Sequence, residues 1–378
     1  MRRVIAKFEI TTPMFLGGAD NSQTVELKPT SVKGVLRFWF RAVNYGKNQD
    51  FKKVKKVEDN IFGSTDSQSR LFLKLRTQDL VEETKSVVEE LFKELGISYL
   101  GYGLDYGQGE RDEKGRKRKV NRPCLRPKQT FSLELLLNPR ISDEISIENL
   151  IMPVKALGLF GGLGSRSRRG FGSVTLNSIC IDGNEHWAKP KTRSDLLTAY
   201  KDFYSFLELG DPLPEYTAFS KNNKTIVLKE SNSYKNALQE VGSALMGFRR
   251  DCRSDAKIIS NYLKNVEVEE HPRRIVFGLP HNYFIRSVGK VEINPIMGGG
   301  TRRASPLFIK IISIKENGYI PVLTLFPAIF LPEGGKIRLK GERKRERDLT
   351  PQISYDLIAD FMKGCVENMD ALEVTPNG

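Results

Sequence analysis

The sequence has few cysteines and no long apolar run. Its four cysteines stand far apart, at Cys124, Cys180, Cys252 and Cys365. This spacing suggests neither a zinc knuckle nor a dense disulfide framework, so reduced thiols are expected. No stretch of about 18 apolar residues could span a membrane. The opening MRRVIAKFEITT alternates like a strand and lacks the apolar block of a signal peptide. We therefore expect a cytoplasmic protein without membrane attachment.

Acidic residues are scarce relative to basic ones. The chain has 46 Asp and Glu against 60 Lys and Arg, which leaves a formal net charge of +14. A polyanion is the expected partner, with nucleic acid ahead of an anionic membrane. The 378 residues exceed what one core usually spans, and a hydrophobic content of 39% is enough for two packed cores. Two domains are expected.

Glycine and arginine are concentrated in residues 158–174, GLFGGLGSRSRRGFGSV, here called the arginine loop. The planar guanidinium groups of Arg166, Arg168 and Arg169 match phosphate oxygens, and the glycines let backbone N–H groups come close to a ligand. The alternative is a tight helix-to-strand connection whose arginines face water. Three arginines within four residues, with glycine on both sides, favour contact with phosphate or nucleic acid.

A basic stripe is predicted on a helix near the N-terminus. Apolar residues recur with helical spacing over residues 32–44, and Thr30 or Ser31 can cap the first turn. Three basic residues share the opposite face four positions apart, so their charges repel unless water or a polyanion compensates them. The three are Lys33, Arg37 and Arg41. A solvated face and a nucleic-acid contact both remain open for this stripe.

The first half is expected to follow the order strand, helix, strand, strand, helix, strand. These elements are residues 4–10, 32–44, 71–75, 131–137, 146–163 and 171–181. A further amphipathic helix at residues 80–95 is interpreted as an insertion. The order is the split βαβ, or ferredoxin-like, arrangement that RNA-recognition modules share.

The second half is expected to follow a polar linker around residues 183–190. Its predicted elements are helices at 196–209, 234–248 and 256–263, a hairpin of 307–314 and 319–330 around Asn317-Gly318, and a helix at 353–372. A degenerate second ferredoxin-like unit fits the late strands and the final helix. We therefore predict an α+β fold with two RRM-like domains, at residues 1–183 and 195–378, each an antiparallel sheet with helices on one face.

Residues 169–176, RGFGSVTL, partly match the consensus of RNA-recognition modules. Ser173 and Leu176 stand where the consensus has base-stacking aromatic residues. The segment also follows a helix, whereas the consensus lies on the third strand of that fold. The sequence therefore predicts a clamp on the RNA backbone and no stacking of bases on this sheet.

Three further basic segments differ in their interpretation. Residues 298–307, GGGTRRASPL, repeat the order of glycines, paired arginines and strand, so Arg302 and Arg303 are assigned to a second phosphate-facing loop, with a flexible strand entry as the alternative. The run at 111–128 is expected to be a surface loop, and its contact with nucleic acid is left open. The run at 336–347 alternates with acidic residues, so internal pairing and solvation are expected there.

Four segments of the chain resemble a known family. FEITTPMFLGGAD, SVKGVLRFWFRA, SRSRRGFGS and RRASPL look like the first-numbered Cmr subunit of type III-B CRISPR effector complexes, in the repeat-associated mysterious protein (RAMP) superfamily. The resemblance implies ferredoxin-like folds and RNA binding within an assembly of Cmr subunits. It also implies a place toward the 3′ end of the guide RNA, where guide and target RNA are held. Trp39 lies at one of the family's motif positions, yet its helical spacing assigns it to the core.

Related RAMP proteins include metal-independent ribonucleases that process guide-RNA precursors, so an enzyme of that kind is the alternative. Such cleavage needs a general base and a general acid. The chain has three histidines, at 186, 271 and 281, and none lies within the motifs. His271, beside Arg273 and Arg274, is the best residual candidate. No Asp or Glu set has metal-ligand spacing, and Asp20 is interpreted as a turn former.

The sequence thus predicts a non-catalytic RNA-binding subunit without a metal or a cofactor. Its expected partners are guide RNA, single-stranded target RNA and other Cmr subunits. The residues assigned to RNA binding are Lys33, Arg37, Arg41, Ser165, Arg166, Arg168, Arg169, Arg302 and Arg303.

Overall fold

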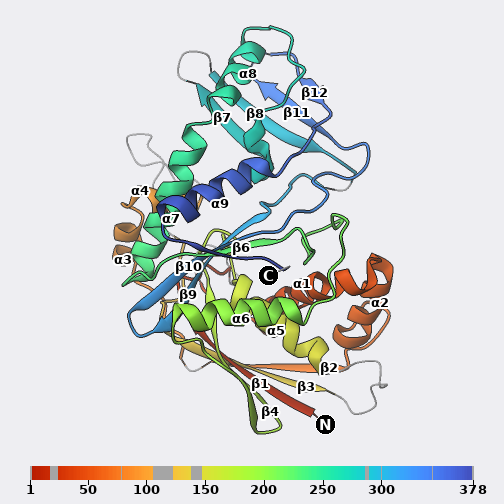
Figure 1. Ribbon diagram of the computed structural model, residues 1–378, viewed down its shortest axis with the longest axis vertical. Coiled ribbons are helices and arrows are strands. Elements are labelled where there is room, and N and C mark those ends of the chain that lie inside the picture. The colour runs from red at the N-terminus through yellow and green to blue at the C-terminus, as the bar shows by residue number, and fades with distance from the viewer. Residues whose placement is uncertain are drawn as a thin grey trace.

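The computed structural model describes residues 2–17, 24–77, 79–104, 122–137, 147–285, 289–298, 300–342 and 344–376. Asp20 and residues 111–121 of the first basic run lie outside the described residues. Three antiparallel sheets succeed one another along the long axis of the molecule (Figure 1). The first sheet lies at the bottom of that view, the second in the middle and the third at the top.

Five strands form the first sheet, in the order β2-β3-β1-β4-β5. They are β1 (Arg2–Ile10), β2 (Leu71–Thr77), β3 (Thr130–Leu137), β4 (Val174–Ile181) and β5 (Asn184–Ala188). Alternate side chains of β1 are fully buried, and Phe8 stacks on Phe131 with ring centroids 5.3 Å apart. The order of the first four strands is ferredoxin-like, as predicted from the sequence.

The segment predicted as a linker forms β5 instead. Asp182 and Gly183 both have positive φ, at 49° and 95°, which turns the chain back to pair with β4. Turns of this kind match the twist of a two-residue hairpin. The division of the chain at residues 183 and 195 stays a prediction.

The described part of the first half contains five helices. They are α1 (Pro29–Asn48), α2 (Phe51–Phe62), α3 (Lys85–Leu91), α4 (Leu95–Leu100) and α5 (Glu148–Phe160). The predicted capping of α1 by Thr30 or Ser31 is wrong, because the N-cap is Lys28 and makes no side-chain cap bond. Pro29 takes the first position of the helix, where its fixed φ suits the first turn and its missing N–H costs nothing.

The helix predicted at residues 80–95 is also wrong in its extent. The helix is interrupted between α3 and α4 at Phe92, whose ring stacks on Phe171 at 5.8 Å and contacts Phe15 in a T-shaped arrangement at 6.2 Å. Tertiary packing of this ring thus overrides the helical period of the local sequence.

The second sheet has the order β13-β6-β10-β9. Its strands are β6 (Lys224–Val227), β9 (Leu307–Lys315), β10 (Gly318–Leu325) and β13 (Leu372–Val374), and its helices are α6 (Arg193–Ser205), α7 (Tyr234–Arg250) and α9 (Asp356–Asn368). Along the chain the order β6, α7, β9, β10, α9, β13 repeats the ferredoxin-like topology. The predicted hairpin around Asn317-Gly318 is confirmed.

A third sheet is inserted into this second unit and was not predicted. It has the order β12-β11-β8-β7, with β7 (His281–Ile285), β8 (Gly289–Ile296), β11 (Lys336–Gly341) and β12 (Arg347–Leu349). Helix α8 (Arg253–Leu263) and a 3-10 helix (Arg273–Phe277) accompany it. The basic run at 336–347 spans β11, the turn after it and the first residue of β12. Within it Arg338 pairs with Glu346 at 3.1 Å, which confirms the expected internal pairing.

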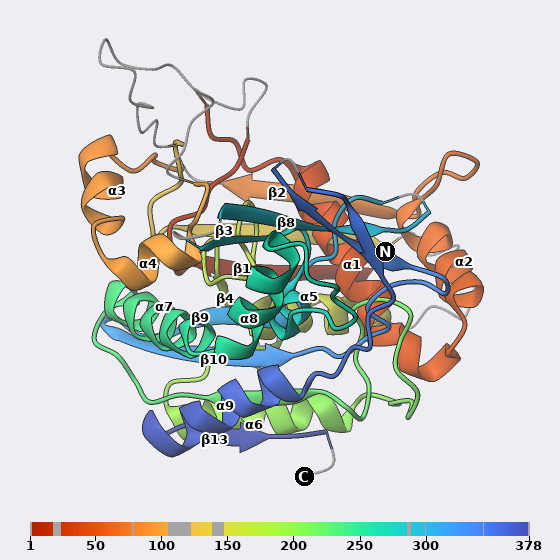
Figure 2. The same ribbon diagram turned by 90° about the horizontal axis from the view of Figure 1, so that it is seen from above.

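The main core lies between the first and second sheets. Trp39 of α1 is 1% exposed and contacts Phe160 of α5, Phe308 of β9 and Phe326, with centroids 6.0 to 6.2 Å apart. The assignment of Trp39 to the core is therefore confirmed. Figure 2 shows β9 and β10 lying between the first sheet and α9. Among the described helices, none is long and apolar enough to cross a membrane.

Candidate nucleic-acid interface

The backbone of the arginine loop is held in a glycine-dependent conformation between α5 and β4. At Gly172 φ is +57°, and a Cβ there would lie 1.9 Å from the carbonyl oxygen of Leu163. The N–H of Ser165 donates to the carbonyl of Phe15 at 2.8 Å, and the N–H of Gly172 donates to the carbonyl of Pro13 at 2.9 Å. The loop is therefore pinned to the segment that follows β1.

Strand β9 of the second half holds the other side of the loop. The N–H of Ile309 donates to the carbonyl of Arg168 at 3.0 Å, and the N–H of Ile311 donates to the Ser173 hydroxyl at 3.1 Å. Lys310 lies between them and is 2% exposed. Its Nζ donates to the carbonyls of Leu157, Gly161 and Val174, at 3.2 Å for Leu157 and 2.7 Å for Val174. A buried lysine thus ties together both ends of the arginine loop.

The three loop arginines differ in exposure and contacts. Arg166 is exposed, and its Nη2 donates to the carbonyl of Tyr102. Arg168 is half-buried, with Nη1 donating to the Ser305 carbonyl at 3.0 Å and the guanidinium 4.5 Å from the ring centroid of Phe308. Burial lowers the pKa of both Arg168 and Arg169 to about 10, so both stay charged at neutral pH.

The second arginine loop lies beside the first. Arg302 is exposed. The pKa of Arg166 is lowered mainly by its own burial and further by the positive charge of Arg302. Arg303 is half-buried and exchanges backbone hydrogen bonds with Leu279 at 2.8 and 2.9 Å. Its positive charge, together with burial, lowers the pKa of Arg168. The structure therefore brings together two loops that stand some 130 residues apart in the sequence, as Arg166 and Arg302 show.

These arginines share one electrostatic property. Within the described ranges, no Asp or Glu forms an ion pair with any of them or with Arg249 of α7, whose charge also lowers the pKa of Arg169. We call these six the arginine cluster: Arg166, Arg168, Arg169, Arg249, Arg302 and Arg303. Like charges gathered without a counter-charge repel one another, and a polyanion relieves that repulsion.

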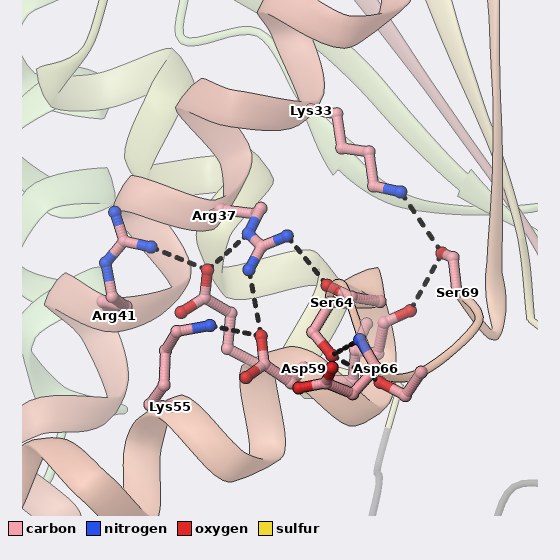
Figure 3. A network of polar contacts seen from close by, with 12 residues as sticks. Lys33, Arg37, Arg41, Lys55, Asp59, Ser64, Asp66 and Ser69 are labelled. Carbon is pink, nitrogen blue, oxygen red and sulfur yellow. Dashed lines mark hydrogen bonds and ion pairs between the residues drawn. The ribbon is translucent and has the colours of Figure 1, made fainter.

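The basic stripe of α1 has a different environment (Figure 3). Arg37 and Arg41 both pair with Glu58 of α2, a fully buried carboxylate that lies 2.6 Å from Arg41, and Arg37 also reaches Asp59 at 3.1 Å. Lys33 donates to the Ser69 hydroxyl at 3.3 Å. The expectation that water or a polyanion compensates the charges of Arg37 and Arg41 is therefore wrong. Glu58 and Asp59, which lie 17 to 22 residues farther along the chain, compensate these charges.

Comparison with known proteins shows a family that part of the chain resembles. Residues 7–175 match the model of the RAMP superfamily. This region is therefore similar to proteins of the RAMP superfamily. It contains the whole arginine loop, whereas Arg249, Arg302 and Arg303 lie beyond it.

Relatives in Pyrococcus furiosus extend the match. The CRISPR system Cmr subunit Cmr1-1 is 25% identical over 334 residues, which are 82% of each chain. Cmr1-2 is 29% identical over 187 residues, 47% of this chain and 97% of the relative. The resemblance to the first-numbered Cmr subunit is thus confirmed.

Two solved structures share the fold. The crystal structure of Cmr1 from Pyrococcus furiosus has a TM-score of 0.59 at 19% identity and covers 99% of this chain and 98% of its own. A chain in the cryo-EM structure of the type III-B Cmr-beta bound to cognate target RNA has a TM-score of 0.56 at 14% identity. The match covers 97% of the present chain and 99% of that chain. This chain therefore shares the overall fold of these two structures over nearly its whole length.

Sequence reasoning missed two residues that the structure places at the arginine loop. Nη2 of Arg249 lies 3.3 Å from both ring nitrogens of His281, on β7. Burial and then the charges of Arg249, Arg274 and Arg169 hold the pKa of His281 well below its usual value, so its ring is neutral at pH 7. The only local signal was the Arg249-Arg250 pair at the end of α7, which by itself resembles an ordinary helix terminus.

The other histidines lie elsewhere. His271 is held against the backbone of Gln352, whose N–H donates to Nε2 at 3.1 Å, and His186 is exposed on β5. In the described part of the chain, no group of three His, Cys, Asp or Glu side chains could hold a metal ion.

Lys310→Met tests the buried lysine that ties the arginine loop to β9. Burial holds the folded pKa of Lys310 well below its ordinary 10.5. Between these two pKa values the unfolded chain binds one more proton than the folded chain, so this group makes stability rise with pH. We expect the unfolding free energy of the wild type, minus that of Lys310→Met, to increase between pH 7 and pH 10, by at most about 1.4 kcal/mol per pH unit. Urea denaturation at several pH values measures it, and a difference that stays constant would contradict the assignment.

Proposed function

We propose that this chain is a non-catalytic RNA-binding subunit of a type III-B CRISPR (Cmr) ribonucleoprotein. It holds guide RNA, toward the 3′ end, and target RNA through a basic groove. One observation carries the proposal: in the described structure, the arginine cluster has no carboxylate partner, whereas Arg37 and Arg41 do. The similarity to Cmr1 proteins, and to a chain of a Cmr complex bound to cognate target RNA, supports it.

The chemistry of the cluster favours the RNA backbone as the ligand. Guanidinium groups bind phosphate oxygens through charge-assisted hydrogen bonds, and phosphates supply the negative charge that the cluster lacks. Arg166 and Arg302 are exposed, so they are the proposed direct contacts. Arg168 and Arg303 are half-buried and hold the two loops in place. Lys33, Arg37 and Arg41 are a secondary part of the groove, because Glu58 and Asp59 already offset two of these charges.

Catalysis is not part of the proposal. RNA cleavage without a metal needs an acid and a base on either side of the reacting phosphate. His271 contacts the Gln352 backbone, and His281 is buried against Arg249. These positions favour structural roles for both rings over the alternative of a guide-processing ribonuclease.

A binding and cleavage assay tests the proposed function. Purified protein is mixed with labelled single-stranded RNAs of unrelated sequence, and shift and cleavage are scored on one gel. We expect similar affinity for all sequences, a steep loss of affinity with salt, and intact RNA. Metal-independent cleavage that disappears in His271→Ala would contradict the non-catalytic role and support a guide-processing ribonuclease. Strong preference for one sequence would contradict a backbone clamp.

A further inference from the structure

The short helix α4 of the first half lies across the long helix α7 of the second half. The two helices are neighbours in both views of the molecule (Figures 1 and 2). They cross at two buried glycines, Gly96 and Gly242. A Cβ at Gly242 would lie 2.8 Å from Cα of Gly96, and a Cβ at Gly96 would lie 2.6 Å from the backbone nitrogen of Ser243. The absence of a side chain at both positions therefore lets the two backbones approach this closely.

Gln239 of α7 fixes the start of α4. Its Oε1 accepts hydrogen bonds from the N–H groups of Gly96 at 2.9 Å and of Ile97 at 3.2 Å. N–H groups in the first turn of a helix have no carbonyl partner within that helix, so Gln239 supplies the acceptor. Its Nε2 donates to the Ser243 hydroxyl at 3.1 Å, which holds the amide in place. Residues of α7 thus determine both how close α4 lies and where along α7 it begins.

The other end of α4 reaches the arginine cluster. Tyr102 follows the helix, and its carbonyl accepts a hydrogen bond from Nη2 of Arg166. On the helix itself, the ring centroid of Tyr99 lies 5.7 Å from the guanidinium of Arg249, at the end of α7. One short segment, residues 96–102, therefore connects the helix crossing to two arginines of the cluster.

We propose that the α4–α7 crossing is a positioning element of the RNA site, in which Gly96, Gln239 and Gly242 hold Arg166 in the orientation that meets a phosphate. The inference rests on the proposed function and adds the residues that orient one of its contacts. A guanidinium has five N–H donors, so Arg166 can bond the Tyr102 carbonyl and phosphate oxygens at the same time. Fixing a long, exposed side chain before RNA arrives also reduces the conformational entropy that binding must remove.

Gly242→Ala tests the crossing, because its added methyl group meets the backbone of Gly96 and displaces α4 from α7. Alanine is a better helix former than glycine, so α7 itself is not weakened. We expect about tenfold weaker binding of single-stranded RNA, through the loss of one charge-assisted contact, and a salt slope smaller by about 0.7. Fluorescence anisotropy over a salt series measures both quantities, and the melting temperature shows that the variant is folded. Gly247→Ala in the same helix is the matched control, because a Cβ there meets no described atom within 4 Å.

A double-mutant comparison separates positioning from general damage to the fold. In the Arg166→Ala background, Gly242→Ala should cause no further loss of affinity, because the contact through which it acts is already absent. Gln239→Ala should weaken RNA binding in the same way as Gly242→Ala, without adding any atom to the crossing. Gln239→Glu should retain the affinity, because its carboxylate can accept the same two N–H groups.

The outcomes separate the two proposals. If the wild type does not bind single-stranded RNA, the RNA-binding function fails and the positioning role fails with it. If the wild type binds RNA, and Gly242→Ala and Gln239→Ala bind it equally well, the function stands and the positioning role is overturned. An equal further loss in the Arg166→Ala background also overturns it. A loss that requires Arg166, with Gly247→Ala like the wild type, supports the positioning role.

Discussion

The double variant Arg166→Ala/Arg302→Ala is expected to bind single-stranded RNA about 10- to 100-fold more weakly than the wild type, at an unchanged melting temperature. Each exposed guanidinium supplies charge-assisted contacts to a phosphate, and losing two such contacts corresponds to this range. For single strands, the slope of log affinity against log salt should fall by about 1.4. Fluorescence anisotropy over a salt series measures both quantities.

The double variant Arg338→Ala/Arg347→Ala provides the charge-matched control. It also removes two positive charges, but both arginines are paired, Arg338 with Asp348 at 2.7 Å and Arg347 with Glu267 at 3.2 Å. We expect its affinity and salt slope to stay close to those of the wild type. Equal loss in the two double variants would mean that net charge alone drives binding and that the arginine cluster is no defined site.

Glu58→Ala is expected to lower the free energy of unfolding by about 2 to 3 kcal/mol. Glu58 is fully buried and accepts hydrogen bonds from Arg37 and Arg41, which stand one helical turn apart. Removing one partner of a buried ion pair costs about 3 to 5 kcal/mol. The loss expected for Glu58→Ala is smaller than this general range because each arginine side chain is still about a quarter exposed, so water partly screens its charge. Urea denaturation monitored by circular dichroism measures the loss.

Two further variants show whether the buried charge is responsible. Glu208→Ala removes a carboxylate that is 69% exposed and 3.8 Å from Lys47, and should change the unfolding free energy by less than about 0.5 kcal/mol. Glu58→Gln keeps the shape and loses the charge, so an intermediate value is expected. If Glu58→Ala were no more destabilising than Glu208→Ala, the ion pairs would not be what holds α2 against α1.

Several parts of the fold follow from short-range patterns. The two-residue period of β1 predicted its buried face, and the helical spacing around Trp39 predicted its place in the core. Asn317-Gly318 predicted the β9–β10 hairpin. Each pattern depends on residues within one or two turns of the chain, and the tertiary environment agrees with it.

Other elements depend on distant packing. The break between α3 and α4 at Phe92 arises because that ring packs on Phe15 and Phe171, which lie 77 and 79 residues away in the chain. In the third sheet the central pair, β8 with β11, forms across a long interval of chain. No local period reports such pairings, and this is why the third sheet was missed.

For the candidate site, the sequence alone determined that glycine and arginine stand together in two segments, and that the chain carries an excess of positive charge. Only the tertiary structure decided which charges have partners. It placed Glu58 against Arg37 and Arg41, brought Arg249 and Arg302 to the arginine loop, and set Lys310 beneath it. The physical reason is range: backbone conformation depends on near neighbours in the chain, whereas charge compensation depends on whichever side chains folding brings within a few ångströms.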